Sequence, residues 1–354
     1  MRLSCMCGAI DAHTHFVPEH FPAYAGKVFD APWPSMAPAQ ACHRNVMVSG
    51  KVYRNVSEQC WSAQRRLDDM AAQQTAHQVL SPMPELLAYW LDADDGGVLC
   101  RFLNDTVAQF VEQAPQSFSG LGAVPLQDVD KAIRELDYLR HELGLIGVEL
   151  GSNVNGKPLG HPDFLPFFRA AAQWGAAIFV HPLRPSGLDR VVGPAFLEQV
   201  VAFPGDTGLC AASIITSNLL EKAPGLRIAF SHGGGSLASL LPRLQHAWNT
   251  LEPLRTTCAE PRAAARRLFY DMLVYDDATV ERLLQIFGDS QLMIGSDYPF
   301  SIMDRQASTR PGQLGLNEEV TRRLMEGNAL RWLGESARAG QATMSATRTP
   351  CHFP

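Results

Sequence analysis

The chain has 354 residues, of which 46% are hydrophobic and 19% are charged, a composition typical of globular proteins. Its formal net charge is −6 and it contains no block of basic residues, so we expect neither nucleic-acid binding nor membrane-surface binding. The apolar runs are too short to span a membrane, and the first residues lack the pattern of a secretory leader. The eight cysteines are scattered and do not show the pattern of a disulfide framework. Together these features predict a soluble, cytoplasmic protein.

A short buried strand is predicted near the N-terminus, where an apolar lead-in runs into Ile10-Asp11-Ala12-His13-Thr14-His15. Side chains alternate between the two faces of a strand, so Asp11, His13 and His15 are expected on one side. Two imidazoles one strand repeat apart can share a cation. The His-x-His pattern is short and common, and taken alone two ordinary histidines explain it equally well.

The next stretch, residues 17–60, is rich in Pro, Gly, Ala and aromatic residues and has no helical periodicity. Within it, Lys51–Val56 alternates as an exposed strand does. We interpret the stretch as an insertion of loops and short strands after the first core strand. A loop this long inside a compact domain is usually functional, frequently as a lid.

From residue 62 onward, strand patterns alternate with helix patterns. Seven further strands are predicted at 76–81, 120–125, 146–150, 177–182, 227–232, 269–272 and 291–297. Helices are predicted at 63–74, 99–113, 128–142 with Asp128 as its cap, 162–174, 194–223 with a break around Pro204-Gly205, 237–248 and 278–287.

Eight strands separated by helices indicate an α/β protein, a (β/α)8 TIM barrel over residues 1–337. An open dinucleotide-binding sheet is disfavoured because Gly-x-Gly-x-x-Gly is absent after the first strand. The small and polar residues of 338–354 are expected to form a disordered tail.

Polar residues close several of the predicted strands. His181, His232 and Asp297 do so, as His13 and His15 do. Each has an ordinary explanation by itself, such as a helix cap or a turn-starting aspartate. The carboxyl ends of barrel strands form the active-site face, however, so the five side chains are expected to converge there.

Four of these side chains predict a metal site. His13, His15 and His181 offer nitrogens and Asp297 a carboxylate, a set that suits one divalent cation, zinc first and manganese as the alternative. Barrels with two metals need a bridging anionic ligand, often a modified lysine on the fourth strand. Residues 146–150 contain no lysine, so a mononuclear site is predicted.

His232 then remains free to act as an acid or base. A cation lowers the pKa of bound water toward neutrality, and a neighbouring imidazole can take the proton. The following Gly233–Gly235 would let the backbone pass close to a ligand without side-chain bulk.

Several segments, in order along the chain, carry a resemblance to a known family. They are Asp11–His15, Lys51–Arg54 with Cys60-Trp61, Ala88–Trp90, Phe118–Pro125, Phe179–Pro182, Phe230–Gly235, Gly295–Phe300 and Gly327–Leu330. From Ile10 to Gly334 the chain resembles the amidohydrolase superfamily and, within it, the family of 2-amino-3-carboxymuconate-6-semialdehyde decarboxylases.

The resemblance implies roles for individual residues. Zinc would be bound by His13, His15, His181 and Asp297, and the acid/base residues would be His232 and Asp297. Arg54 would hold a substrate carboxylate in its own subunit, and Arg243 would reach the neighbouring site of a homodimer, since guanidinium forks suit carboxylates. Without the family, a lone arginine on a helix or edge strand is usually solvated.

The resemblance also places Trp90, Phe300 and Arg184 among the substrate-binding residues. One departure from the family pattern concerns the pocket wall. Leu183-Arg184 follows the His-Pro of the fifth strand where the type enzyme has a tryptophan, so the identity of the substrate stays open while the metal site does not change.

The predicted function is a zinc-dependent, non-oxidative decarboxylase (a carboxy-lyase) acting on a small unsaturated or aromatic carboxylic acid, with 2-amino-3-carboxymuconate-6-semialdehyde as the first candidate. With a conjugated substrate, the metal and His232 would generate a hydroxide that adds to the substrate. A substrate that chelates the metal directly would instead receive the proton that replaces its carboxylate from Asp297 or His232. The alternative is a metal-dependent hydrolase or hydratase that uses the same site on a lactone or unsaturated acid. A non-catalytic metal-binding scaffold is the least expected class.

Overall fold

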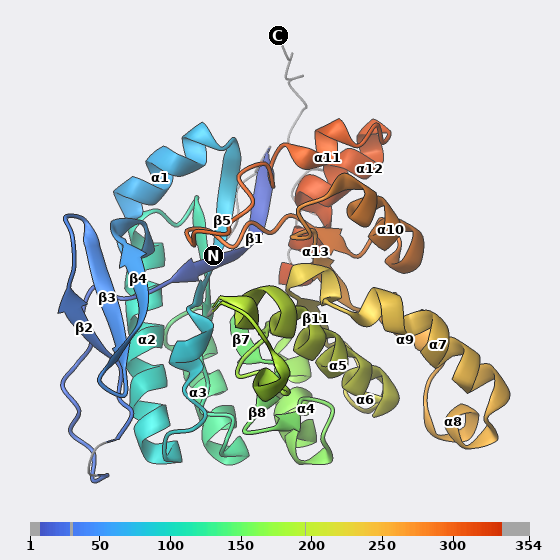
Figure 1. Cartoon of the computed structure of the whole chain (residues 1–354), viewed down its shortest axis with the longest axis horizontal. Coiled ribbons are helices and arrows are strands. Elements are labelled where there is room, and N and C mark those ends of the chain that lie inside the picture. Colours follow the sequence, from blue (N-terminus) through green and yellow to red (C-terminus); the bar gives the residue numbers. More distant parts are fainter. Residues whose placement is uncertain (1–7, 29–30, 195, 335–354) are drawn as a thin grey trace.

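The computed structural model describes residues 8–28, 31–194 and 196–334, and the expected tail at 338–354 lies outside them. Eight parallel strands form one sheet, in the order β1 (Ala9–Phe16), β5 (Thr75–Pro82), β6 (Phe118–Gly122), β7 (Gly147–Gly151), β10 (Ala177–His181), β11 (Arg227–Phe230), β12 (Phe269–Asp271) and β13 (Leu292–Met293). Sequential strands are neighbours in space, as in a (β/α)8 barrel (Figure 1). The predicted fold class is confirmed.

The first strand and the segment after the last strand bring the sheet round on itself. The Ala12 N–H donates to the Ile294 carbonyl at 2.9 Å, and the His15 N–H donates to the Tyr298 carbonyl at 2.7 Å. These bonds join β1 to residues just beyond β13, so the barrel is nearly closed. The first barrel strand and the segment after the last one therefore meet at one seam of the barrel.

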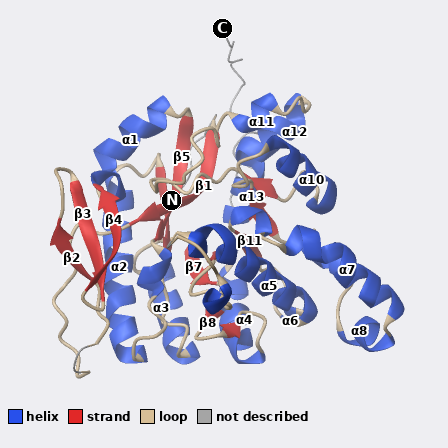
Figure 2. Ribbon diagram, viewed as in Figure 1, coloured by secondary structure: helices blue, strands red, loops and turns tan. Residues whose placement is uncertain are grey.

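Helices cover the outside of the barrel (Figure 2). The main ones are α1 (Ala63–Ala72), α2 (Ala93–Gln113), α3 (Val129–His141), α4 (Leu165–Trp174), α5 (Phe203–Thr216), α7 (Leu237–Thr250) and α10 (Asp277–Phe287). Shorter ones are α6 (Leu219–Lys222), α8 (Glu252–Thr257), α9 (Pro261–Ala265), α11 (Arg310–Gln313), α12 (Glu318–Arg322) and α13 (Asn328–Leu333). No helix among the described residues is both long and apolar enough to cross a membrane.

Some predicted boundaries are wrong for local physical reasons. Asp128 caps α3 as predicted, with its side chain accepting from the Lys131 N–H at 3.0 Å. The interruption predicted around Pro204-Gly205 lies beside an observed change of helix type, from the π-helical turn Glu198–Ala202 to α5, which has Pro204 in its first turn. A second interruption, which was not predicted, falls at Asn218, whose φ of 57° ends the helical path.

The barrel interior below the site is apolar and closely packed. Its buried side chains include Ile10, Val79, Leu121, Phe179 and Met293. Gly147 on β7 shows how close the strands approach, because a Cβ atom there would lie 1.8 Å from the Ala177 carbonyl oxygen. Only glycine fits at this position, which fixes how β7 lies against β10.

The insertion after β1 forms a three-stranded antiparallel sheet of β2 (Ser35–Pro38), β3 (His43–Val48) and β4 (Lys51–Ser57). This small sheet lies beside the barrel, at the left of Figure 1. The strand predicted at residues 51–56 is thereby confirmed as β4. A second hairpin, β8 (Asn153–Val154) with β9 (Lys157–Pro158), follows β7.

Candidate metal centre and active site

Strand β1 positions two imidazoles at the centre of the barrel. Every residue of Ala9–Phe16 is buried, and the Nε2 atoms of His13 and His15 lie 3.0 Å apart. Asp11 does not join them, since a register irregularity separates it from Thr14 and its carboxylate accepts instead from the Ser296 N–H at 3.0 Å. The pair therefore faces inward without the aspartate that was expected beside it.

Two further ligands reach the same point from distant parts of the chain. His181 is the last residue of β10. Asp297 lies beyond the end of β13, in a loop fixed by a hydrogen bond from its own N–H to the His13 carbonyl at 3.0 Å. The ligand atoms of all four side chains lie within 4.8 Å of one another, and all four residues are buried.

The four side chains fit a divalent cation. Each histidine Nδ1 lies near an acceptor: Asp271 Oδ2 at 2.7 Å from His13, the Pro82 carbonyl at 3.4 Å from His15, and the Pro182 carbonyl at 3.0 Å from His181. A ring that donates through Nδ1 presents the lone pair of Nε2, which is the form that binds metals. The Asp297 Oδ1 atom is buried and lies 3.0 Å from His15 Nε2 and 3.5 Å from His13 Nε2, so these ligand atoms surround one point.

Electrostatics favour the ligand forms of these groups. Burial lowers the pKa of His15 to about 4 and that of His181 well below its usual value, so both rings are neutral at pH 7. Burial opposes the charge of Asp297, but the contact with His15 and the nearby imidazoles outweigh it and lower the Asp297 pKa to about 2. Burial also opposes the charge of His13, but its hydrogen bond to Asp271 and the nearby carboxylates outweigh burial and raise the His13 pKa. The centre thus offers two neutral nitrogens, a third nitrogen on a ring polarised by Asp271, and one carboxylate.

Sequence analysis missed one carboxylate, Asp271, the last residue of β12. Its side chain accepts from His13, as described above, and from the backbone N–H groups of Gly233 at 2.8 Å and Leu273 at 3.1 Å. It therefore orients a proposed metal ligand and the turn that carries His232 at the same time. Its position at a strand end, like that of the predicted ligands, was the available signal.

His232 lies just past β11, next to the four-ligand cluster. Its ring centroid is 5.1 Å from that of His181 and 5.5 Å from that of His13, yet it is not among the four clustered ligands. Its φ of 54° is the left-handed conformation, and Gly233 continues it with a φ of 62°. Burial lowers the pKa of His232, which leaves the ring neutral and able to accept a proton at pH 7.

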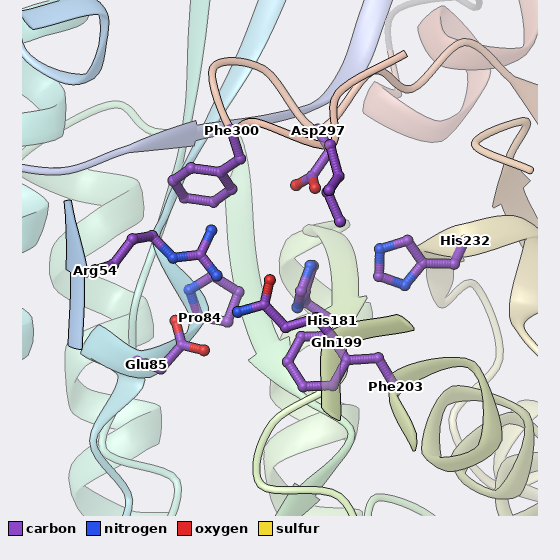
Figure 3. A pocket seen from close by; sticks show the side chains of 10 residues that line it. Arg54, Pro84, Glu85, His181, Gln199, Phe203, His232, Asp297 and Phe300 are labelled. Atoms are coloured by element: carbon purple, nitrogen blue, oxygen red, sulfur yellow. The ribbon is translucent and has the colours of Figure 1, made fainter. Parts of the chain in front are cut away.

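His181, Asp297 and His232 face one pocket, whereas His13 and His15 are not part of its lining. It is lined by Arg54, Pro84, Glu85, His181, Gln199, Phe203, His232, Asp297, Phe300 and Ile302 (Figure 3). Strand β4 of the insertion brings Arg54 to one wall, where its guanidinium carbon lies 4.1 Å from the centre of the Phe300 ring. Phe300 in turn stacks on His15 with ring centroids 4.9 Å apart.

The other predicted substrate-binding residues lie elsewhere. Arg184 stacks over Trp90 with 3.3 Å between its guanidinium carbon and the ring centre, and both line a separate cavity with Asn153 and Asn155. Arg243 is exposed on α7 and is absent from the lining of the pocket. Within one chain, the structure therefore brings Arg54 and Phe300 to the site but not these three residues.

Comparisons with known proteins agree with this geometry. A family model described as Amidohydrolase matches residues 10–334. The chain is 34% identical over 336 residues to the 2-amino-3-carboxymuconate-6-semialdehyde decarboxylase of Dictyostelium discoideum, which covers 92% of this chain and 91% of that protein.

Solved structures are similar as well. The 5-carboxyvanillate decarboxylase of Sphingomonas paucimobilis superposes with a TM-score of 0.70 at 27% identity, over 76% of this chain and 82% of that chain. A dihydroxybenzoic acid decarboxylase from Polaromonas, with bound manganese and the inhibitor 2-nitroresorcinol, gives a TM-score of 0.74 at 20% identity, over 94% of this chain and 98% of that chain. The latter likeness is one of fold.

Proposed function

The chain belongs to the amidohydrolase family, and from this premise we propose that it is a metal-dependent, non-oxidative decarboxylase of a small unsaturated or aromatic carboxylic acid. One observation carries the proposal: two of the clustered cation ligands, His181 and Asp297, line a single pocket together with the neutral imidazole of His232 and the guanidinium of Arg54. The similarity to the Dictyostelium discoideum enzyme makes 2-amino-3-carboxymuconate-6-semialdehyde the first substrate to test.

His13, His15, His181 and Asp297 would hold one divalent cation per chain, zinc first and manganese as the alternative. Three nitrogens and a carboxylate suit either ion, and the Polaromonas relative carries manganese. When bound, the cation supplies positive charge that polarises a coordinated oxygen and lowers the pKa of water.

The chain's own residues supply the remaining chemistry. Arg54 binds a substrate carboxylate through its guanidinium fork and so fixes the orientation of the acid. His232, held neutral by burial, takes up a proton and delivers it to the carbon that carries the leaving carboxylate. The new C–H bond takes an electron pair from the π system of the unsaturated acid. The carbon–carbon bond then breaks, CO2 leaves, and the electron pair of the broken bond restores the π bond.

The test is CO2 release by the metal-loaded enzyme from 2-amino-3-carboxymuconate-6-semialdehyde and from a panel of hydroxybenzoates. His232→Ala is expected to keep its metal and to lose roughly 100-fold or more in turnover. His141→Ala, an exposed residue at the end of α3, serves as the control.

Each part of the proposal can be refuted by a specific result. Full turnover by a metal-bound His232→Ala protein would refute the acid/base role. Substrate consumed without CO2 would favour the hydrolase or hydratase alternative. Two ions per chain by elemental analysis would refute a mononuclear centre.

We also propose that the enzyme works as a homodimer in which Arg243 reaches the neighbouring pocket. Large apolar side chains are exposed before α5 and on α7: Val192 is 91% exposed, Phe196 77% and Leu240 43%. Such a surface favours contact with a second copy. Leu240 lies on α7 with Arg243, and α7 packs against α5.

Complementation between two variants tests the shared site. Arg243→Ala and His232→Ala proteins are each expected to be inactive, whereas co-expressed mixed dimers regain activity because one of their two pockets keeps both residues. Light scattering should give twice the chain mass. A monomeric mass, or an Arg243→Ala enzyme with unchanged kinetics, would contradict the dimeric site.

A further inference from the structure

One wall of the pocket pairs a guanidinium with a carboxylate that the metal centre does not use. Glu85 follows β5 in a short 3-10 helix, Pro84–Leu87, and it lines the pocket together with Arg54. In Figure 3, Arg54 and Glu85 lie on the side of the pocket opposite His232. The charge of Glu85 is felt by Arg54, since burial lowers the Arg54 pKa but Glu85, Tyr53 and Asp297 together raise it above its usual value.

The two oxygens of Glu85 are in different situations. The Tyr53 hydroxyl donates a hydrogen bond to Oε1. The Oε2 atom is buried and has no hydrogen-bond partner among the described residues. A buried hydrogen-bond acceptor without a donor costs free energy. Because Glu85 Oε2 is such an acceptor at the wall of the pocket, it favours a ligand that carries a hydrogen-bond donor.

The same carboxylate also disfavours some ligands. A carboxylate bound by Arg54 is attracted to this wall, but a second carboxylate placed next to it meets the negative charge of Glu85. A hydroxyl or amino group in that place would instead donate to Oε2. The wall is therefore complementary to an anionic group with a neutral donor beside it.

We propose, resting on the decarboxylase function above, that Glu85 is a specificity-determining residue whose Oε2 accepts a hydrogen bond from a hydroxyl or amino group of the substrate while Arg54 binds the substrate's carboxylate. The preferred substrates are hydroxy- or amino-substituted acids. Acids that can place only a second carboxylate at that position are rejected, whereas 2-amino-3-carboxymuconate-6-semialdehyde, which carries an amino group besides its two carboxylates, can place the amino group there.

Calorimetric binding to the metal-loaded enzyme tests the proposal without turnover. The probes are benzoate, its 2-hydroxy, 3-hydroxy, 2-amino and 3-amino derivatives, and benzene-1,2-dicarboxylate. In the wild type, the best donor-bearing probe should bind roughly tenfold to 100-fold more tightly than benzoate, and the dicarboxylate should bind most weakly. Comparing hydroxyl with amino probes identifies the donor.

Two substitutions at Glu85 separate its charge from its acceptor. Glu85→Gln keeps the shape, so the dicarboxylate should gain about tenfold in affinity while donor-bearing probes lose part of their advantage. Glu85→Leu should remove the advantage of donor-bearing probes over benzoate. Direct chelation of the metal by a 2-hydroxy acid is common to all variants, so it cancels when the variants are compared.

Glu198→Gln is the matched control. Glu198 lies in the neighbouring π-helical turn Glu198–Ala202, close enough to Glu85 for their charges to interact, but it is not part of the pocket lining. The control should leave the order of the probes unchanged. Equal selectivity in wild type and both Glu85 variants, or an equal shift in the control, would overturn the proposal.

The binding readout keeps the two proposals apart. If the order of probe affinities depends on Glu85 but no acid releases CO2, the decarboxylase function is refuted and the Glu85 site is supported. If CO2 is released but the order of probe affinities does not depend on Glu85, the decarboxylase function is supported and the Glu85 site is refuted.

Discussion

Residues behind the ligands control the geometry of the candidate metal centre. Asp271 contacts His13 Nδ1 at 2.7 Å and also accepts from the Gly233 N–H at 2.8 Å. One carboxylate therefore sets both the orientation of a proposed ligand and the start of the turn after His232. Loss of such an outer contact typically weakens metal binding about 10- to 100-fold.

Asp271→Asn is expected to weaken metal binding about 10- to 100-fold, because the amide removes the negative charge that orients and polarises His13. Competition with a chromophoric chelator measures the affinity. Asp206→Asn is the control, since Asp206 is a buried carboxylate hydrogen-bonded to Asn153 at 3.1 Å, away from the four ligands. Equal affinities in wild type and Asp271→Asn would contradict the role of Asp271.

The sequence indicates some site residues far better than others. His13, His15, His181 and Asp297 are readily noticed because each is a metal-competent side chain at or after a strand. Glu85 gives no such signal: it lies in a short helix after β5, and its contact with Tyr53 joins that helix to strand β4 of the insertion. That juxtaposition exists only once the insertion has folded beside the barrel.

At the scale of elements, the order and type of strands and helices follow from hydrophobic periodicity, but their ends do not. β13 covers only Leu292–Met293, so Asp297 is placed by the hydrogen bond to the His13 carbonyl and not by its own strand. α2 begins at Ala93, well before the predicted start, because Asp92 caps it and tertiary packing tolerates the glycines of its first turns.

Two glycines should respond in opposite ways to alanine. Gly147→Ala forces a Cβ atom against the Ala177 carbonyl at the β7–β10 contact, and we expect a loss of about 3 kcal/mol or more in the free energy of unfolding. Gly97→Ala in α2 meets nothing within 4 Å and should stabilise by about 0.5–1 kcal/mol. Urea denaturation measures both, and an unaffected Gly147→Ala protein would show that β7 and β10 can separate.

The pairing of β5 with β6 contains a pH-sensitive contact. His77 is fully buried, with Ser119 Oγ at 2.8 Å and the Gln116 carbonyl at 3.1 Å, and burial lowers its pKa to about 4. As pH falls below about 6.5, His77 becomes protonated in the unfolded chain, whereas in the folded chain it stays neutral down to about pH 4. The stability contributed by neutral His77 is thus complete above pH 6.5 and lost between pH 6.5 and 4.

That loss is roughly 3 kcal/mol for the whole interval. His77→Gln should therefore show a smaller drop in the free energy of unfolding between pH 7.5 and pH 5 than the wild type. Metal-loaded protein is used so that the clustered histidines do not titrate, and His141→Gln, at an exposed position, is the control. Parallel pH profiles for wild type and His77→Gln would refute this assignment.

At the scale of the whole molecule, the metal site joins parts of the chain that are far apart in sequence. Its ligands come from β1, from the end of β10 and from the loop after β13. Two of these segments also form the seam that closes the barrel, through the hydrogen bonds of Ala12 and His15. A bound cation therefore holds the first and last parts of the barrel together.

Metal removal is expected to destabilise the whole barrel, since a ligand that binds only the folded state stabilises it by about 2.7 kcal/mol at 100 times its Kd. Calorimetry should show a lower unfolding temperature after chelation and recovery on addition of zinc or manganese. His13→Ala should show neither response. An unfolding temperature that does not depend on metal would contradict the predicted coupling.

The place of Asp297 has a consequence for biosynthesis. Of the four ligands, the ribosome releases the two histidines of β1 first and this carboxylate last, so the growing chain cannot complete the ligand set until the last barrel strand has been synthesised. Binding by all four ligands is then a late step in biosynthesis. Chains truncated between His181 and Asp297 would keep three histidines but lack the carboxylate, and they should retain the ion less tightly than the finished protein.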